Sequence, residues 1–162
     1  MSSLEISDLE PGKIDNYYMS EAFKYAQKAF DIAEVPVGAI IVYKNQIIAA
    51  QYNKKETDNL VTSHAELLAI NQASNHLKNW RLNDCTMYVT LEPCPMCAGA
   101  IIQSRISKIV YGAKNPNYGS FSSVISLHEY YPDAKNLEII SGIMETENIN
   151  IMKSFFRKKI NV

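Results

Sequence analysis

Two stretches of the chain, residues 62–70 (TSHAELLAI) and residues 89–105 (VTLEPCPMCAGAIIQSR), decide how it folds. In the first, His64 and Glu66 stand at the head of an apolar segment. In the second, Cys94 and Cys97 stand at the head of another apolar segment, directly after a run of strand-forming residues. We therefore expect one site assembled from the starts of two helices.

The segments on either side of these stretches alternate between strand and helix patterns. Apolar residues at helical spacing predict helices, and short runs rich in Val, Ile and Tyr between turn residues predict strands. This alternation predicts a layered α/β domain with some parallel strand pairing. The expected helices cover residues 19–30, 65–77, 96–103 and 146–160, and the expected strands cover residues 37–43, 46–52, 86–91, 108–111 and 137–140.

Length and composition indicate an ordinary globular protein. The 162 residues fit a single domain over positions 1–162, with a loose N-terminal extension over residues 1–16. The N-terminus does not resemble a signal peptide, and no apolar run approaches the length of a membrane span. With only three cysteines as well, we expect a reducing, cytoplasmic location and no membrane, and we expect thiols that bind metal sooner than disulfides.

One imidazole and two thiolates form a set of ligands that suits zinc. His64, Cys94 and Cys97 would supply three protein ligands and leave the fourth tetrahedral position to water, as in catalytic zinc sites. Helix N-termini favour the thiolate form of cysteine, because their unpaired N–H groups carry partial positive charge. We therefore expect one Zn²⁺ per subunit, held where two helices begin.

Glu66 lies two residues after the histidine, which places it within reach of the bound water without making it a ligand. A carboxyl group there can take a proton from the water and later deliver protons to the substrate ring and to the departing amine. We therefore expect Glu66 to be the catalytic base and then the catalytic acid. Glu92 is expected to orient the turn before Cys94 rather than to take part in catalysis.

Other ligand sets fit the spacing less well. A closed structural site would use Cys85 as a fourth ligand, but Cys85 precedes the strand that Cys94 follows, and six extended residues span about 20 Å. His76 follows His64 by twelve helical residues, which separates the two side chains by about 18 Å and turns them about 120° apart. A chance match with no metal is the remaining alternative.

Charge is unevenly distributed along the chain, and the C-terminal end is basic. A net charge of −1 argues against a protein that coats nucleic acid along its whole surface. The last ten residues (KSFFRKKINV) nevertheless carry four bases and no acid. Such a tail can hold a phosphate backbone and an unstacked base, or it can be the solvated end of an amphipathic helix.

The two short motifs match H-x-E and P-C-x-x-C, the signature of zinc-dependent nucleobase deaminases. EVPVGAIIV, YNKK, IVYGAKNP and MKSFFRKK extend the match, and residues 17–159 resemble the bacterial tRNA-specific adenosine deaminases in order and spacing. This resemblance implies a cytidine-deaminase-like three-layer α/β/α sandwich with a central mixed sheet of about five strands. It also implies a homodimeric zinc hydrolase that deaminates adenosine to inosine at the wobble position of a tRNA anticodon stem-loop.

The resemblance also implies roles for individual residues. Asn53 matches the asparagine that hydrogen-bonds the target base, and Val37 matches a residue that lines the pocket beside it. The C-terminal segment resembles the helix that contacts the anticodon. The implied site thus comprises the ligands His64, Cys94 and Cys97, the proton shuttle Glu66, and the substrate-binding residues Val37, Asn53, Asn115, Phe155, Phe156 and Arg157.

The chain departs from the family pattern at two places. Val61-Thr62-Ser63 replaces the usual Pro-Thr-Ala before the histidine. Asn115 and Asn117 stand where the family usually has an acidic residue near the target ribose and a lysine. Asn115 can still accept a hydrogen bond from a ribose hydroxyl, with weaker discrimination against deoxyribose expected. Alternatively, Asn115 stabilises the turn before Pro116.

Two other functions compete with this one. A free-base or nucleoside deaminase, of the guanine or cytosine type, would have a closed pocket and little use for the FFRKK segment. A catalytically idle zinc module that binds RNA or a partner protein would have no need for Glu66.

Overall fold

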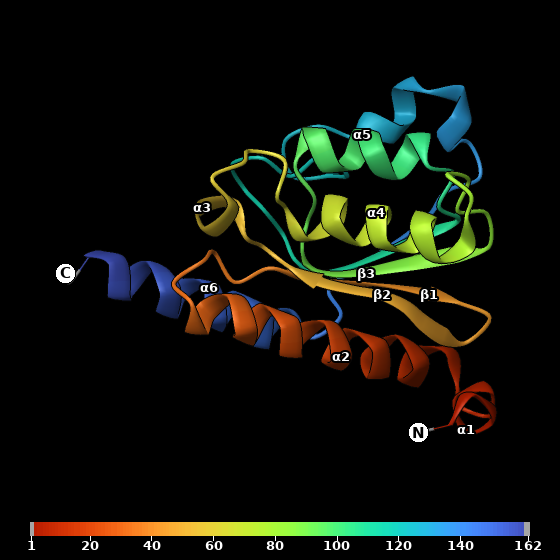
Figure 1. The fold of residues 1–162 in the computed structure, drawn as a ribbon, viewed down its shortest axis with the longest axis horizontal. Helices are drawn as coiled ribbons and strands as arrows, with labels where there is room; N and C mark the ends of the chain where they lie inside the picture. Colours follow the sequence, from red (N-terminus) through yellow and green to blue (C-terminus); the bar gives the residue numbers. More distant parts are fainter. Residues whose placement is uncertain (1, 161–162) are drawn as a thin grey trace.

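Five strands form a mixed sheet that is covered by helices on both faces (Figure 1). Their alternating apolar side chains form two hydrophobic cores, one on each face. The structure is a computed structural model that describes residues 2–160. The strand order is β2-β1-β3-β4-β5. β1 pairs antiparallel with β2 and β3, whereas β4 pairs parallel with β3 and β5. The strands are β1 (Gly38–Tyr43), β2 (Gln46–Tyr52), β3 (Cys85–Leu91), β4 (Lys108–Ala113) and β5 (Glu138–Ser141).

Each face of the sheet is covered by helices. Successive side chains of a strand point to opposite faces, so that Ala39 and Ile41 of β1 enter one core and Ile40 and Val42 enter the other. Helices α4 (Ala65–Leu77) and α5 (Pro95–Gln103) cover the first face, and α2 (Pro11–Asp31) and α6 (Glu145–Ile160) cover the second (Figure 1). The predicted three-layer sandwich with five strands is confirmed.

Small residues bring α2 close to the sheet. Ala22 and Ala26 are fully buried on the face of α2 that meets β1. A Cβ atom at Gly38 would collide with the Ala22 carbonyl oxygen and with the backbone of Ala26. Gly38 therefore permits the close approach of helix and strand just where β1 begins.

The N-terminal segment differs from the loose extension expected over residues 1–16. A short helix α1 (Ser3–Ser7) is capped by Ser2, and α2 already begins at Pro11. Ile6 is buried, and the buried Asp15 carboxylate accepts hydrogen bonds from the Tyr88 hydroxyl at 2.8 Å and from Lys108 at 3.2 Å. These contacts hold the segment against the second face of the sheet. Met1 lies outside the described residues.

Most expected elements are present within one or two residues of their predicted bounds. The C-terminal helix, predicted over residues 146–160, is α6. Besides α1, three short elements were not anticipated, namely α3 (Lys55–Asp58), η1 (Leu127–Tyr130) and η2 (Pro132–Ala134). Each of these three has only three or four residues, which is too short for a periodic apolar pattern.

Strand β2 forms one edge of the sheet, and a side chain of α4 covers part of this edge. The Ala50 N–H donates to Oε1 of Gln72 at 3.0 Å. The Gln51 side chain donates to the same oxygen at 2.7 Å. An outward-facing backbone donor of the edge strand is thereby satisfied within the chain.

Among residues 2–160, no helix combines the length and the apolar character that crossing a membrane requires.

Candidate active and metal site

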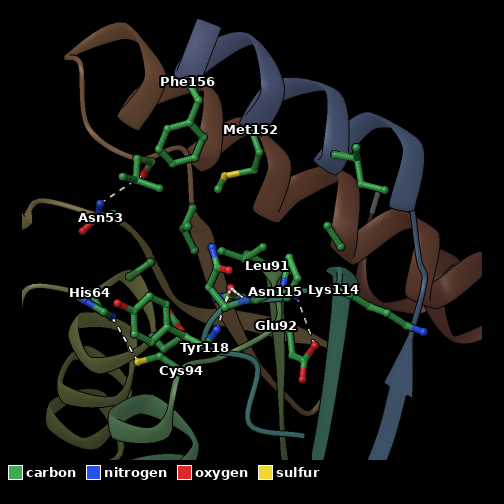
Figure 2. A pocket seen from close by; sticks show the side chains of 18 of the residues that line it. Asn53, His64, Leu91, Glu92, Cys94, Lys114, Asn115, Tyr118, Met152 and Phe156 are labelled. Carbon is green, nitrogen blue, oxygen red and sulfur yellow. Dashed lines mark hydrogen bonds between the residues drawn. The ribbon is translucent and has the colours of Figure 1, made fainter. Parts of the chain in front are cut away.

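The sheet topology brings five chain segments together at one end of the central strands. β3 and β4 run parallel and both end there, with Leu91 paired to Ala113. β1 runs the opposite way and begins at the same end, where Gly38 pairs with Tyr52 at the end of β2. The segments that follow β2, β3 and β4, the segment before β1 and the start of α4 therefore meet around one cavity (Figure 2).

His64, Cys94 and Cys97 converge at the starts of α4 and α5. Their ligand atoms all lie within 4.8 Å of one another. His64 Nδ1 lies 3.4 Å from Cys97 Sγ and 3.7 Å from Cys94 Sγ. His64 and Cys94 occupy N-cap positions without capping their own helices, so both side chains are free to point toward each other. This cluster could hold a metal ion, as predicted.

The protonation of these groups fits a cation site. A hydrogen bond with Cys97, opposed by burial, lowers the pKa of the Cys94 thiol to about 4. The hydrogen bond with Cys94 raises the pKa of His64, and the same sulfur-sulfur hydrogen bond together with burial raises the pKa of Cys97. A divalent cation bound by the three groups would displace the protons that they otherwise hold, and this donor set suits zinc.

Glu66 lies in the first turn of α4 and is only 4% exposed. It lines the cavity together with His64 and Cys94. Burial raises the pKa of this carboxyl above its usual value. A buried carboxyl that can both hold and release a proton next to a metal site is suited to general acid–base chemistry.

The cavity has a volume of about 1340 Å³ and opens between the site and helix α6 (Figure 2). His64 and Cys94 lie on one side of it, and Met152 and Phe156 of α6 lie on the other. Exposed charged residues around it are mostly basic. They are the bases Lys55, Lys114, Lys153 and Arg157 and the acid Glu145.

Comparison with known proteins identifies the family. Residues 14–159 match the MafB19-like deaminase family. The chain is 43% identical over 144 residues to the tRNA-specific adenosine deaminase of Bacillus subtilis, a match that covers 89% of each chain. The chain belongs to the tRNA-specific adenosine deaminases.

Solved structures of other deaminases have the same fold as this deaminase. A structure from a study of A-to-I editing by tRNA:A34 deaminases at the wobble position superposes with a TM-score of 0.78 and 37% identity, covering 83% of this chain and 98% of that one. A guanine deaminase from Bacillus subtilis superposes with a TM-score of 0.60 and 33% identity, covering 70% and 73%. The predicted family and cytidine-deaminase-like fold are therefore confirmed.

Asn53 and Val37 of the deaminase both line the cavity and are buried. The Asn53 amide donates to the Val35 carbonyl oxygen at 3.3 Å and to Glu34 Oε2 at 3.4 Å, while its oxygen accepts from the Lys55 N–H at 3.2 Å. The amide is thereby held in one orientation. Its contact with the target base stays a prediction.

Glu34 is a residue of the site that sequence reasoning missed. Its side chain is 1% exposed, and Oε1 accepts from the Thr57 N–H at 2.6 Å and from the Thr57 hydroxyl at 2.9 Å. Glu34 therefore ties helix α3 to the segment before β1 and supports Asn53. An acidic residue directly before Val-Pro-Val, in an otherwise apolar stretch, was the signal that could have revealed it.

Glu92 organises the loop after β4, whereas the sequence predicts that it orients the turn before Cys94. The carboxylate accepts from the backbone N–H groups of Asn115, Phe121, Ser122 and Ser123 at 2.9–3.3 Å and from the Ser123 hydroxyl. Burial alone would raise the pKa of Glu92, but these hydrogen bonds outweigh burial and lower it.

Asn115 lines the cavity, but its side-chain oxygen is engaged in the turn. Oδ1 accepts from the Asn117 N–H at 3.3 Å and from the Tyr118 N–H at 3.2 Å. This geometry supports the turn-stabilising alternative. Its contact with a ribose hydroxyl stays a prediction, which the relative rates on matched RNA and DNA hairpins test.

The three C-terminal candidates do not share one environment, although the rings of Phe155 and Phe156 meet edge to face with centroids 5.2 Å apart. Phe156 and Arg157 line the cavity and are exposed. Phe155 is 6% exposed and packs against Phe30 of α2, so it faces the interior of the protein. The expected contact of Phe155 with RNA is therefore corrected to a packing role.

Cys85 lies at the opposite end of β3 from the cluster, as expected, and is fully buried. Burial raises the pKa of its thiol to about 11. Among the described residues, the metal-ligating group contains neither Cys85 nor His76.

Proposed function

We propose that this chain is a zinc-dependent hydrolase that converts adenosine to inosine at the wobble position of a tRNA anticodon, acting in the cytoplasm as a homodimer with one zinc per subunit. The observation that carries the proposal is the position of Glu66. It lies beside a His/Cys/Cys cluster in a cavity with a basic rim. The proposed substrate, a tRNA adenosine, follows from the similarity to tRNA-specific adenosine deaminases.

The reaction consumes water and releases ammonia. Zinc held by His64, Cys94 and Cys97 would supply Lewis-acid activation of the attacking water. Glu66 takes one proton from that water as its oxygen attacks C6 of adenine, and gives this proton to the ring nitrogen N1. It then takes the second proton from the new C6 hydroxyl group and gives it to the amine, which leaves as ammonia while the C6 carbonyl group forms. Because Glu66 is buried, water competes little for these protons.

Asn53 and Val37 orient the adenine. An amide fixed by Val35, Glu34 and Lys55 offers a directional hydrogen-bonding group, while Val37 offers an apolar surface to the ring. Because the amide is already ordered, binding does not require further loss of its rotamer freedom.

The size and charge of the cavity favour an RNA substrate over a free base. Its volume of about 1340 Å³ exceeds the roughly 300–1,000 Å³ of common small-molecule pockets. Four bases against one exposed acid at its rim provide partners for phosphate groups. This arrangement explains how a chain with a net charge of −1 binds a polyanion through one restricted surface.

The proposal is tested by incubating the zinc-loaded protein with an anticodon stem-loop and, separately, with free adenosine, cytosine and guanine. We expect inosine in the stem-loop, detected by mass spectrometry of the digested nucleosides, and slow or absent turnover of the free compounds. Rapid turnover of guanine with an inert stem-loop would instead favour a guanine deaminase. Sedimentation analysis tests the homodimer.

A further inference from the structure

An exposed tyrosine stands at the cavity without a role in the chemistry described above. The Tyr118 side chain is 65% exposed. Of the large hydrophobic side chains exposed among residues 2–160, those that line the cavity are Val61, Tyr118, Phe156 and Ile160. Tyr118 and Phe156 are thus the two aromatic members of this group.

The two rings lie on opposite walls of the cavity. Figure 2 shows Tyr118 on the side of Asn115 and the His64–Cys94 pair, and Phe156 on the side of helix α6. Exposed Lys114 precedes Tyr118 by four residues and lines the same cavity. Proteins that bind single-stranded nucleic acid combine aromatic side chains, on which bases stack, with a positively charged groove that contacts the phosphates.

The backbone holds Tyr118 in place. The Tyr118 N–H donates to Asn115 Oδ1 at 3.2 Å, and the Gly119 N–H donates to the Asn115 carbonyl oxygen at 2.8 Å. A Cβ atom at Gly119 would collide with the Glu92 carboxylate, so glycine lets the loop lie directly on this buried anchor. The ring is therefore presented on a preorganised loop, which lowers the entropy lost when a ligand binds.

A substrate whose target base enters the cavity needs such a surface. When one base leaves the stack to reach Glu66, a neighbouring base loses a stacking partner. We propose that Tyr118 stacks on the nucleobase directly beside the target adenosine and so forms a subsite for the flanking nucleotide. This inference rests on the proposed function and adds a recognition residue to it.

The test pairs protein variants with altered stem-loops. Two RNAs carry an abasic nucleotide, one directly 5′ and one directly 3′ of the target adenosine. With the unaltered protein, we expect one of them to lower kcat/KM by about 5- to 150-fold, the range for the loss of one base–aromatic stack. With Tyr118→Ala, the intact stem-loop suffers a similar loss, and the same abasic site causes no further loss.

Two variants serve as controls. Tyr118→Phe keeps the ring and retains the wild-type penalty for the abasic RNA. Tyr130→Ala removes a tyrosine that is 71% exposed but lies outside the cavity lining, and it behaves as the unaltered protein does. Zinc content and melting temperature are measured for every variant, so that loss of folding is recognised.

The outcomes separate this inference from the function on which it rests. An equal abasic penalty in the unaltered protein and in Tyr118→Ala overturns the stacking subsite while leaving the deaminase function intact. A change in subunit association on Tyr118→Ala, seen by sedimentation, would assign the ring to a second copy of the chain and also overturn it. A zinc-loaded, folded wild type that fails to deaminate the intact stem-loop refutes the proposed function itself.

Discussion

Phe155 of α6 packs against Phe30 of α2, with ring centroids 6.4 Å apart and ring planes at 66°. Phe156, the next residue, is 46% exposed and turns toward the cavity. Adjacent phenylalanines thus face different surroundings. Removing all residues after Met152 would delete both rings together, so single substitutions are needed to separate packing from substrate binding.

We expect Phe155→Ala to destabilise the protein and Phe156→Ala to weaken RNA binding. Loss of the buried ring is expected to lower the free energy of unfolding by about 3 kcal/mol or more and the melting temperature by about 6 °C or more. Loss of the exposed ring should change stability by less than about 1 kcal/mol. Thermal melts and stem-loop binding, measured on both variants, check this division. Equal loss of stability in the two would contradict it.

Glu66→Gln is expected to abolish most deamination without removing the metal. The amide has nearly the same shape but cannot take a proton from water, and general acid–base groups typically contribute about 10²- to 10⁴-fold. The measurements are inosine formation from the stem-loop and zinc per subunit. Glu66→Ala serves as a second variant that also removes the bulk. Activity that survives both changes would remove Glu66 from its assigned role.

Cys94→Ala and Cys97→Ala are each expected to lose the metal, whereas Cys85→Ala retains it. Cys85 is the matched control, because it is buried and lies at the other end of β3. Its pKa of about 11 leaves roughly one thiol in a thousand ionised at pH 8, so it should also resist alkylation in the folded protein. Metal analysis of the three variants, and thiol labelling with and without a chelator, show which cysteines bind the metal. Comparable metal loss in Cys85→Ala would point to a closed structural site.

Arg157→Gln should weaken stem-loop binding in a way that depends on salt. Removing one protein–phosphate interaction makes the slope of log K against log [salt] shallower by about 0.7–0.9. Lys135 is exposed but lies outside the cavity lining, so Lys135→Gln is the control of equal charge. Titrations between low and moderate salt give both slopes. Identical slopes for the two variants would mean that Arg157 touches no phosphate.

Glu92→Gln is expected to loosen the loop over residues 115–123. Its amide group would present N–H donors toward backbone N–H groups that now share a carboxylate, and buried donors without an acceptor are costly. Hydrogen exchange at these amides should accelerate, and KM for the stem-loop should rise. Asn115→Asp keeps an acceptor for the turn and is expected to leave the exchange rates unchanged. Slow exchange in Glu92→Gln would count against the anchoring role.

The sequence predicts those features that depend on short-range spacing. The helix over residues 65–77 and the strands over residues 37–43 and 46–52 follow from local apolar patterns, and the set of three ligands follows from two helix starts. Contacts that depend on the order of strands in space were not accessible in this way. Glu92 reaches a hydroxyl 31 residues away, and Asp15 reaches Lys108 93 residues away.

The sequence also cannot show which of two neighbouring residues is buried when one face of their helix packs against the protein and another lines a cavity. Phe155 and Phe156 look alike in the sequence, and only the position of α2 decides which of them is buried. Tyr118 carries no pattern of its own, since its exposure results from the turn at Asn115 and from the anchor beneath Gly119.

The hydrogen bond from Ala50 to Gln72 bears on how the protein behaves at high concentration. An outer strand with free N–H groups can act as a template for a strand of another chain, which leads to aggregates. Gln72 occupies one of these donors from a helix whose first turn carries Glu66. The same helix therefore carries a catalytic candidate in its first turn and, at Gln72, a side chain that shields the edge strand. Replacing Gln72 alone would free the Ala50 donor without altering Glu66, and would show first as precipitation during expression rather than as slower turnover.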